Sequence, residues 1–175
     1  MTPRRTLILG WGNPGRRDDG LGPALAEALA GAEGPALTVD SGYQLQVEDA
    51  ADLARHERVL FVDADRAGGE PFSLRRLEPA PMPASFSSHS VSPGQLLALA
   101  HGLYGAAPEA WLMGIRGYEF DEFGEGLSAR ARANLAAAVG CVRAVLCSGA
   151  FQEFPPSRSR RSEPRPAPHR EVEHA

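Results

Sequence analysis

The sequence of 175 residues contains no lysine: all 18 of its basic residues are arginines. Catalysis through a Schiff-base lysine and phosphate binding by a P-loop lysine are therefore excluded. Positive charge is also in short supply, because 22 acidic residues outnumber the arginines and give a formal net charge of −4. A chain without an overall basic field is not expected to bind nucleic acid or an anionic membrane surface.

Cysteine is scarce as well, with only Cys141 and Cys147 in one apolar stretch. Two such residues suit neither a disulfide framework nor a zinc site, so we expect core cysteines and a reducing compartment. The arginine pair near the start precedes an apolar run that ends by Arg16, too soon for an export signal, which predicts a cytoplasmic protein. The apolar stretch 135–151 is short and contains Arg143, so we predict an amphipathic helix and no membrane partner.

Short apolar runs alternate with longer segments of helical periodicity. Strands are predicted at 6–10, 36–39, 58–62, 72–77 and 110–115, and helices at 21–29, 42–56, 95–104 and 128–145. Strands separated by helices indicate βαβ crossovers. The predicted fold is a single α/β domain over residues 1–150, with a mainly parallel twisted sheet and helices on both faces. Residues 151–175 are rich in proline and arginine and are predicted to form a disordered tail.

The glycine-rich loop Gly10–Gly15 (GWGNPG) allows more than one interpretation. It matches the G-x-G-x-x-G dinucleotide fingerprint, and Asp40 ends the second predicted strand where a ribose-binding acid would lie. Asp18 and Asp19 oppose a pyrophosphate at the following helix, so a nucleotide-binding oxidoreductase is kept only as an alternative. The loop also resembles the start of bacterial peptidyl-tRNA hydrolases, but the catalytic histidine of that family is missing and the chain is acidic.

Four blocks of the sequence resemble, in the same order, the motifs of the hydrogenase maturation endopeptidases. These blocks are GNPGRRDDGLG at 12–22, RVLFVDADRAGG at 58–69, SSHSVSPGQLLALAHGLYG at 87–105 and WLMGIRGYEFDEFGEGLS at 111–128. Members of that family remove a C-terminal extension from the large subunit of nickel–iron hydrogenases. The resemblance implies that the partner is such a large-subunit precursor, and that the metal involved is nickel already carried by that precursor.

The resemblance also implies a metal-binding and catalytic site formed by Asp19, Asp63 and His89. The predicted topology supports the grouping, because Asp19 follows the first strand and Asp63 follows the third. The carboxyl ends of parallel strands share one edge of the sheet, where α/β proteins place their sites. Two carboxylates and an imidazole can bind a divalent transition metal and leave positions open for substrate or water.

Neighbouring polar residues are assigned supporting roles. Asp18 is predicted to cap the helix at 21–29. Strand alternation alone does not decide between Asp63 and Asp65, but alignment with the family block favours Asp63 and makes Asp65 a solvated or turn-capping residue. Asn13 is expected to form a turn before Pro14, with contact to the site as the alternative.

The sequence has no persuasive serine–histidine–acid or cysteine nucleophile pattern, so the expected chemistry is metal-assisted hydrolysis. Nickel would polarise the scissile carbonyl while Asp19 or Asp63 assists the attack of water. The acidic residues Asp121, Glu122 and Glu125 are expected to be solvated, with a place at the rim of the site as the alternative. A metal-dependent checkpoint or chaperone that binds the precursor without cutting it is the alternative function.

Overall fold

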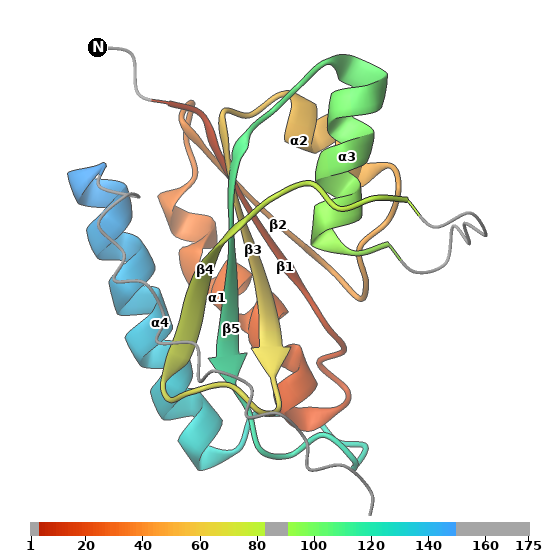
Figure 1. Ribbon diagram of the computed structural model, residues 1–175. Helices are drawn as coiled ribbons and strands as arrows, with labels where there is room; N and C mark the ends of the chain where they lie inside the picture. The colour runs from red at the N-terminus through yellow and green to blue at the C-terminus, as the bar shows by residue number, and fades with distance from the viewer. Residues whose placement is uncertain (1–3, 83–90, 150–175) are drawn as a thin grey trace, which may run out of the picture.

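A computed structural model describes residues 4–82 and 91–149, and in it a five-stranded sheet lies between two layers of helices (Figure 1). The strands are β1 (Thr6–Trp11), β2 (Leu37–Gly42), β3 (Arg58–Asp65), β4 (Phe72–Leu77) and β5 (Glu109–Arg116). The α-helices are α1 (Leu21–Leu29), α2 (Asp49–Ala54), α3 (Pro93–Tyr104) and α4 (Ala129–Ser148), and the 3-10 helices η1 (Arg17–Gly20) and η2 (Ala30–Ala32) flank α1. The predicted α/β fold is confirmed, whereas the predicted tail lies outside the described residues.

The order of the strands in the sheet is β2-β1-β3-β5-β4. β1, β2, β3 and β5 are parallel, and β4 runs antiparallel to β5 at one edge. The chain passes from β1 to β2 on one side and then returns to β3 on the other side of β1. The strand order therefore reverses between β1 and β3, and the carboxyl ends of these two strands form the switch point where open α/β sheets bind their ligands.

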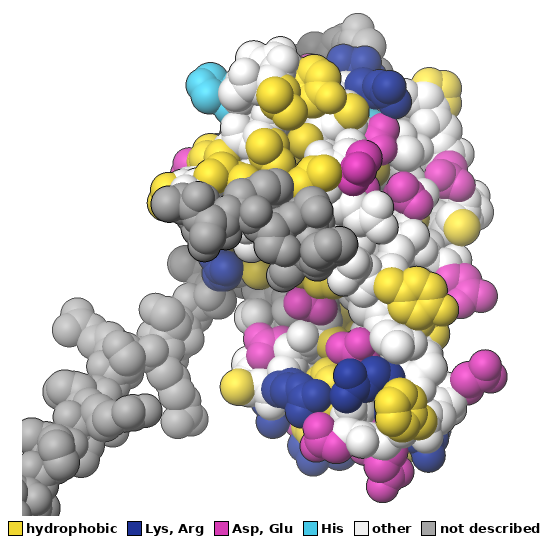
Figure 2. Space-filling model, turned by 90° about the vertical axis from the view of Figure 1, so that its right-hand side faces the viewer, with side chains coloured by type: hydrophobic (Ala, Val, Ile, Leu, Met, Phe, Trp, Pro, Cys, Tyr) yellow, Lys and Arg dark blue, Asp and Glu magenta, His cyan; other side chains and the backbone are white. Residues whose placement is uncertain are grey.

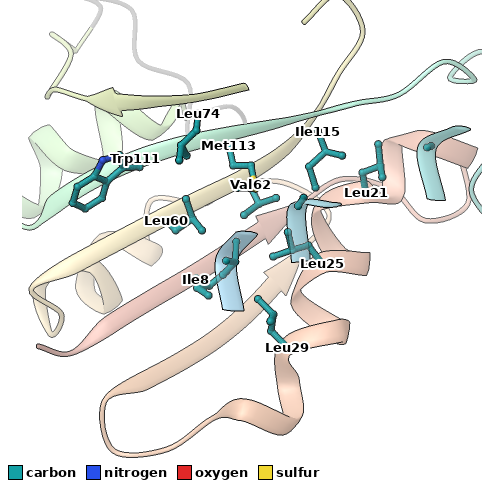
Figure 3. Packing of buried hydrophobic residues seen from close by; sticks show 13 residues of the cluster. Ile8, Leu21, Leu25, Leu29, Leu60, Val62, Leu74, Trp111, Met113 and Ile115 are labelled. Carbon is teal, nitrogen blue, oxygen red and sulfur yellow. The ribbon is translucent and has the colours of Figure 1, made fainter. Parts of the chain in front are cut away.

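Alternate residues of the central strands point to opposite faces of the sheet. Ile8 and Leu60 pack with α1 and α4 on one face (Figure 3), whereas Leu7 and Phe61 pack with α2 and α3 on the other. Both faces are buried, which explains why these strands read as continuous apolar runs in the sequence. The leucines of α1 lie four residues apart and are fully buried, as the periodicity predicts.

Most predicted bounds shift by three residues or fewer, and two of the changes bear on the site. The helix predicted over 42–56 shortens to Asp49–Ala54, because an Asp49 carboxylate oxygen accepts the amide of Gln46 at 2.8 Å and closes a turn ahead of it. Strand β3 extends beyond the predicted Val62 to Asp65, since β5 pairs with it as far as Arg116. The last residues of β3 therefore belong to a rigid strand rather than to a loop.

Helix α4 closes the face that α1 covers. Its buried residues, Ala131, Asn134, Ala138 and Val142, form one stripe against the sheet and α1. Within the described residues, α4 is the helix whose length and composition would allow a membrane span. The prediction that both cysteines lie in the core is wrong, because they fall outside this stripe: Cys147 is exposed and Cys141 is half-buried.

Candidate functional site

The loop after β1 packs tightly against the start of α1. At Gly12, φ is 141°, and a Cβ there would lie 1.9 Å from the carbonyl oxygen of Asp19. A Cβ on Gly22 would lie 2.4 Å from the carbonyl oxygen of Trp11 and 2.7 Å from that of Val62. Only glycine permits these approaches, which bring η1 against the ends of β1 and β3 at the switch point.

Asp19 lies in η1 at this point of the sheet. One of its carboxylate oxygens accepts the backbone amide of Asn13 at 2.8 Å, which joins the two ends of the loop. The Asn13 side chain in turn accepts the amide of Gly15 at 2.9 Å, so Asn13 forms the turn expected of it. Within the part of the chain that the structure describes, the other carboxylate oxygen of Asp19 accepts no hydrogen bond and is open to a further ligand.

Asp63 lies near the end of β3 and is half-buried. Burial raises its pKa to about 6, and the nearby charges of Asp19 and Asp65 contribute, although a bond from the Ala64 amide at 2.8 Å acts in the opposite direction. Asp19 and Asp63 are therefore close enough to repel one another. Among the described residues, neither forms an ion pair.

Asp65 has a different task. One of its carboxylate oxygens accepts the amides of Ala67 and Gly68 at 2.9 and 2.8 Å, and this oxygen caps the turn after β3. A Cβ on Gly68 would meet this carboxylate at 2.2 Å, so the turn is built around it. The expectation of a turn residue at Asp65 is confirmed, and Asp63 is the freer of the two carboxylates.

Asp18 does not cap α1, so that prediction is wrong: the N-cap residue of α1 is Gly20, without a side-chain hydrogen bond. The fully buried carboxylate of Asp18 instead accepts hydrogen bonds from the amides of Tyr118, Glu119 and Ser128 and from the hydroxyl of Ser128, at 2.7 to 3.0 Å. Burial acts to raise the pKa of Asp18, but these hydrogen bonds outweigh it, and the pKa lies below its usual value. Its partners lie about a hundred residues away, so no local sequence signal could have revealed this role.

The segment 117–128 forms one wall of the switch point. Asp18 fixes this loop to η1, and Arg66, which follows β3, places its guanidinium 4.2 Å from the ring centre of Phe120. Arg66 also pairs with Asp121 at 3.2 Å, and Asp121 is largely exposed. Glu122 and Glu125 are exposed too, so these acids are solvated as expected, and they also lie on the segment that borders the site.

The third predicted site residue, His89, lies outside the described residues. Within residues 4–82 and 91–149, no group of three or more His, Cys, Asp or Glu side chains is arranged to hold a metal ion. Asp63 is on the α3 side of the sheet, as Phe61 is, because the two are two residues apart on β3. Helix α3 begins at Pro93, shortly after His89 in sequence, and its first turn is the end directed towards the carboxyl edge of the sheet (Figure 1).

The chemistry of the two carboxylates fits a divalent cation. A half-buried carboxyl with a raised pKa beside a second carboxylate is a costly arrangement that a bound cation would relieve. The same loop does not fit a pyrophosphate. Its amides at Gly12, Asn13, Gly15 and Arg16 all donate hydrogen bonds within the protein, and two of those bonds are made to Asp19 and to the side chain of Asn13. A nucleotide would therefore find these donors engaged and a carboxylate in its place.

No protein-family model matches the chain, and no curated protein matches it by sequence. Solved structures do match. The hydrogenase maturating endopeptidase HybD from E. coli is 24% identical to this chain, with a TM-score of 0.68. The NiFe hydrogenase maturation protease HycI from Thermococcus kodakarensis is 22% identical, with a TM-score of 0.65. Each of these two matches covers 83% of this chain and 94% of the other. A hydrogenase 2 maturation peptidase from a Thaumarchaeota archaeon is 27% identical with a TM-score of 0.60, over 82% of this chain and 99% of the other.

All three of these proteins are named as peptide hydrolases of one kind, and the match covers nearly their whole length. The fold and the four sequence blocks both resemble those of the maturation proteases. The chain therefore has the fold of the NiFe hydrogenase maturation proteases, the family that its motifs resemble.

Proposed function

We propose that this protein is a cytoplasmic endopeptidase that removes the C-terminal extension of a nickel–iron hydrogenase large-subunit precursor. The observation that carries the proposal is the pair of carboxylates, Asp19 and Asp63, at the switch point of a sheet with the maturation-protease fold. The pair lies where this class of sheet binds its ligands, and its mutual repulsion suits a cationic ligand.

Recognition of nickel in the precursor is the first step of the proposal. Asp19 and Asp63 supply two oxygen ligands, and His89 supplies an imidazole nitrogen on the basis of its sequence motif. This mixed set of imidazole and carboxylate suits a first-row transition ion that keeps other positions for the ligands of its own protein. The nickel ion belongs to the substrate, so a precursor without nickel would lack the main contact with the enzyme.

Hydrolysis of the peptide bond is the second step. Bound nickel draws electron density from the scissile carbonyl, and a carboxylate removes a proton from the attacking water. Asp19 or Asp63 serves as the base through a carboxylate oxygen that the metal leaves free. The protonated acid then returns its proton to the leaving amine, so the carboxylate is regenerated in each turnover.

The test is the intact mass of a purified large-subunit precursor after incubation with the protein, with and without nickel loading. The wild type is expected to release a C-terminal peptide only from the nickel-loaded precursor. Asp63→Asn and His89→Ala are expected to lower the rate at least about a hundredfold, the scale of loss for a catalytic base or metal ligand.

Matched controls separate this chemistry from general damage. Asp121→Asn removes an exposed carboxylate from the same end of the sheet, and His101→Ala removes an exposed imidazole from α3. Both variants are expected to cleave at the wild-type rate. Normal cleavage by a folded His89→Ala variant would reject the proposed metal contact, and binding without any change in mass would favour the non-cleaving checkpoint.

A further inference from the structure

Phe123 is the most exposed large apolar side chain among the described residues, with 87% of its surface accessible. It projects from the segment 117–128 beside the candidate site. Arginines, acids and exposed apolar side chains gather at the lower end of the face in Figure 2, which is the end of the molecule where Figure 1 places this segment. An exposed ring next to a functional site is a feature that binding surfaces share.

The backbone around Phe123 is fixed rather than loose. The amide of Arg17 donates to the carbonyl of Gly124 at 3.0 Å, and the amide of Gly124 donates to that of Gly15 at 2.9 Å. Arg17 adopts a left-handed conformation with φ of 52°, which is unusual for a residue with a side chain. This strained turn pairs the first loop with the segment that carries Phe123, so the ring is presented in advance of any partner.

Arg16 lies beside the exposed ring of Phe123. Its guanidinium lies 5.7 Å from the ring centre of Phe123 and makes a long bond of 3.5 Å to the carbonyl of Phe120. Among the described residues Arg16 has no carboxylate partner, although six ion pairs engage other arginines. A stacked guanidinium with unused donors is well placed to bind a carboxylate of another molecule.

A polar hollow of about 380 Å³ borders this pair and is lined by residues 118–122, three of which are the acids Glu119, Asp121 and Glu122. Its lining also includes Phe120, whose ring centre lies 4.2 Å from the Arg66 guanidinium. Together, Arg16 and Phe123 form what we call the Arg16–Phe123 surface. The surface is continuous with the candidate site, because Arg16 accepts the amide of Asp19 at 3.2 Å through its carbonyl.

We propose that the Arg16–Phe123 surface docks the C-terminal extension of the large-subunit precursor, an inference that rests on the proposed function. The extension begins at the scissile bond, so a bound precursor must lead it away from the carboxylate pair over an adjoining surface. Every such extension ends in a free carboxylate, which Asp19 and Asp63 repel and Arg16 attracts. The exposed ring of Phe123 supplies apolar contact area for its side chains.

The test measures the affinity of the full chain for two forms of the nickel-loaded large subunit: the precursor and the same protein truncated at the cleavage site. Phe123→Ser and, separately, Arg16→Gln are expected to weaken binding of the precursor about tenfold, the usual effect of losing an aromatic or arginine anchor. Both variants are expected to bind the truncated form as tightly as the wild type does, because that form lacks the extension. Both side chains are exposed, so the unfolding midpoint should stay unchanged.

Tyr43→Ser and Arg55→Gln are the matched controls, because they remove an exposed aromatic ring and an exposed guanidinium from other parts of the surface. Unchanged precursor affinity in both Phe123→Ser and Arg16→Gln would overturn the docking proposal. An equal loss for the truncated form would also overturn it, since the contact would then be with the body of the subunit. Failure of the proposed function is a separate result: the wild type would bind the precursor and leave its mass unchanged.

Discussion

Two carboxylates at the same end of the sheet lie in opposite surroundings. Asp18 is fully buried and accepts four hydrogen bonds, three from backbone amides and one from a hydroxyl, and its pKa lies below the usual value. Asp63 is half-buried, accepts one amide within its own strand, and has a pKa raised to about 6. The first carboxylate is satisfied by the fold, whereas the second is left with unmet charge.

This difference separates structural from functional acids. A buried charge with a full set of donors stabilises the elements that supply them, and here it joins η1 to the segment 117–128 and to the start of α4. A charge that the fold does not satisfy costs stability and is retained where a ligand completes it. Sequence proximity hides the distinction, because Asp18 is adjacent to Asp19, which belongs to the unsatisfied pair.

The largest effect is expected from Asp18→Ala. The substitution leaves three partly buried amides and the Ser128 hydroxyl without their acceptor, and it opens a small cavity where the buried carboxylate lay. We expect the free energy of unfolding to fall by about 3–5 kcal/mol, as when one partner of a buried charged network is removed. Urea denaturation at pH 7 measures this, and a loss below about 1 kcal/mol, the net worth of a single ordinary hydrogen bond, would show that Asp18 does not hold the loop.

Asp63→Asn is expected to raise the free energy of unfolding, whereas Asp18→Ala lowers it. A carboxyl whose pKa rises from 3.8 to about 6 on folding disfavours the folded state above pH 6. Removing that charge should raise the free energy of unfolding by about 1–3 kcal/mol at pH 7, since each pKa unit corresponds to about 1.4 kcal/mol and partial exposure screens part of it. The gain should shrink as the pH falls from 6 and disappear below about 4. A destabilised Asp63→Asn variant at pH 7 would contradict the interpretation of unmet charge.

Binding of a divalent cation should follow the ionisation of Asp63. Below pH 6 a proton competes with the cation, so the affinity for Ni²⁺ should fall about tenfold for each further pH unit and be nearly constant above pH 7. Calorimetric titration of the His89→Ala variant isolates the carboxylates from the histidine. Affinity that stays constant from pH 7 to pH 5 would rule out Asp63 as a ligand.

The smallest effect is expected from Asp121→Asn. This carboxylate is 89% exposed and forms only a surface ion pair with Arg66, so stability should change by less than about 0.5 kcal/mol. Nickel affinity should also match that of the wild type. A large change in stability or nickel affinity would mean that any carboxylate on this edge of the sheet has the same effect. The contrast between Asp18 and Asp63 would then not distinguish a structural acid from a functional one.

The sequence predicted the parallel sheet and its helices because both depend on local periodicity. Buried strands such as β3 and the leucine spacing of α1 are visible without any knowledge of tertiary structure. The prediction of one helix over residues 42–56 was wrong because a turn that the Asp49 side chain closes precedes the shorter helix. The prediction that both cysteines are buried was wrong because a long helix buries only one stripe of its surface, and composition does not say which residues form that stripe.

The candidate site was predictable only in part. Strand ends placed Asp19 and Asp63 together, and the turn role of Asp65 followed from alignment with the family block. The role of Asp18 depends on donors that approach from the segment 117–128, so it was assigned to the nearest helix instead. The Arg16–Phe123 surface was missed for the same reason, since its two residues meet only through the pairing of distant loops.

The most direct test is the intact mass of the nickel-loaded precursor after incubation with the wild type, Asp63→Asn and Asp121→Asn, each confirmed as folded. If Asp19 and Asp63 form the site, the wild type and Asp121→Asn should remove the C-terminal peptide. Asp63→Asn should leave the precursor uncut, even though this variant is expected to be the more stable protein. Cleavage by Asp63→Asn at the wild-type rate would contradict the assignment of this site.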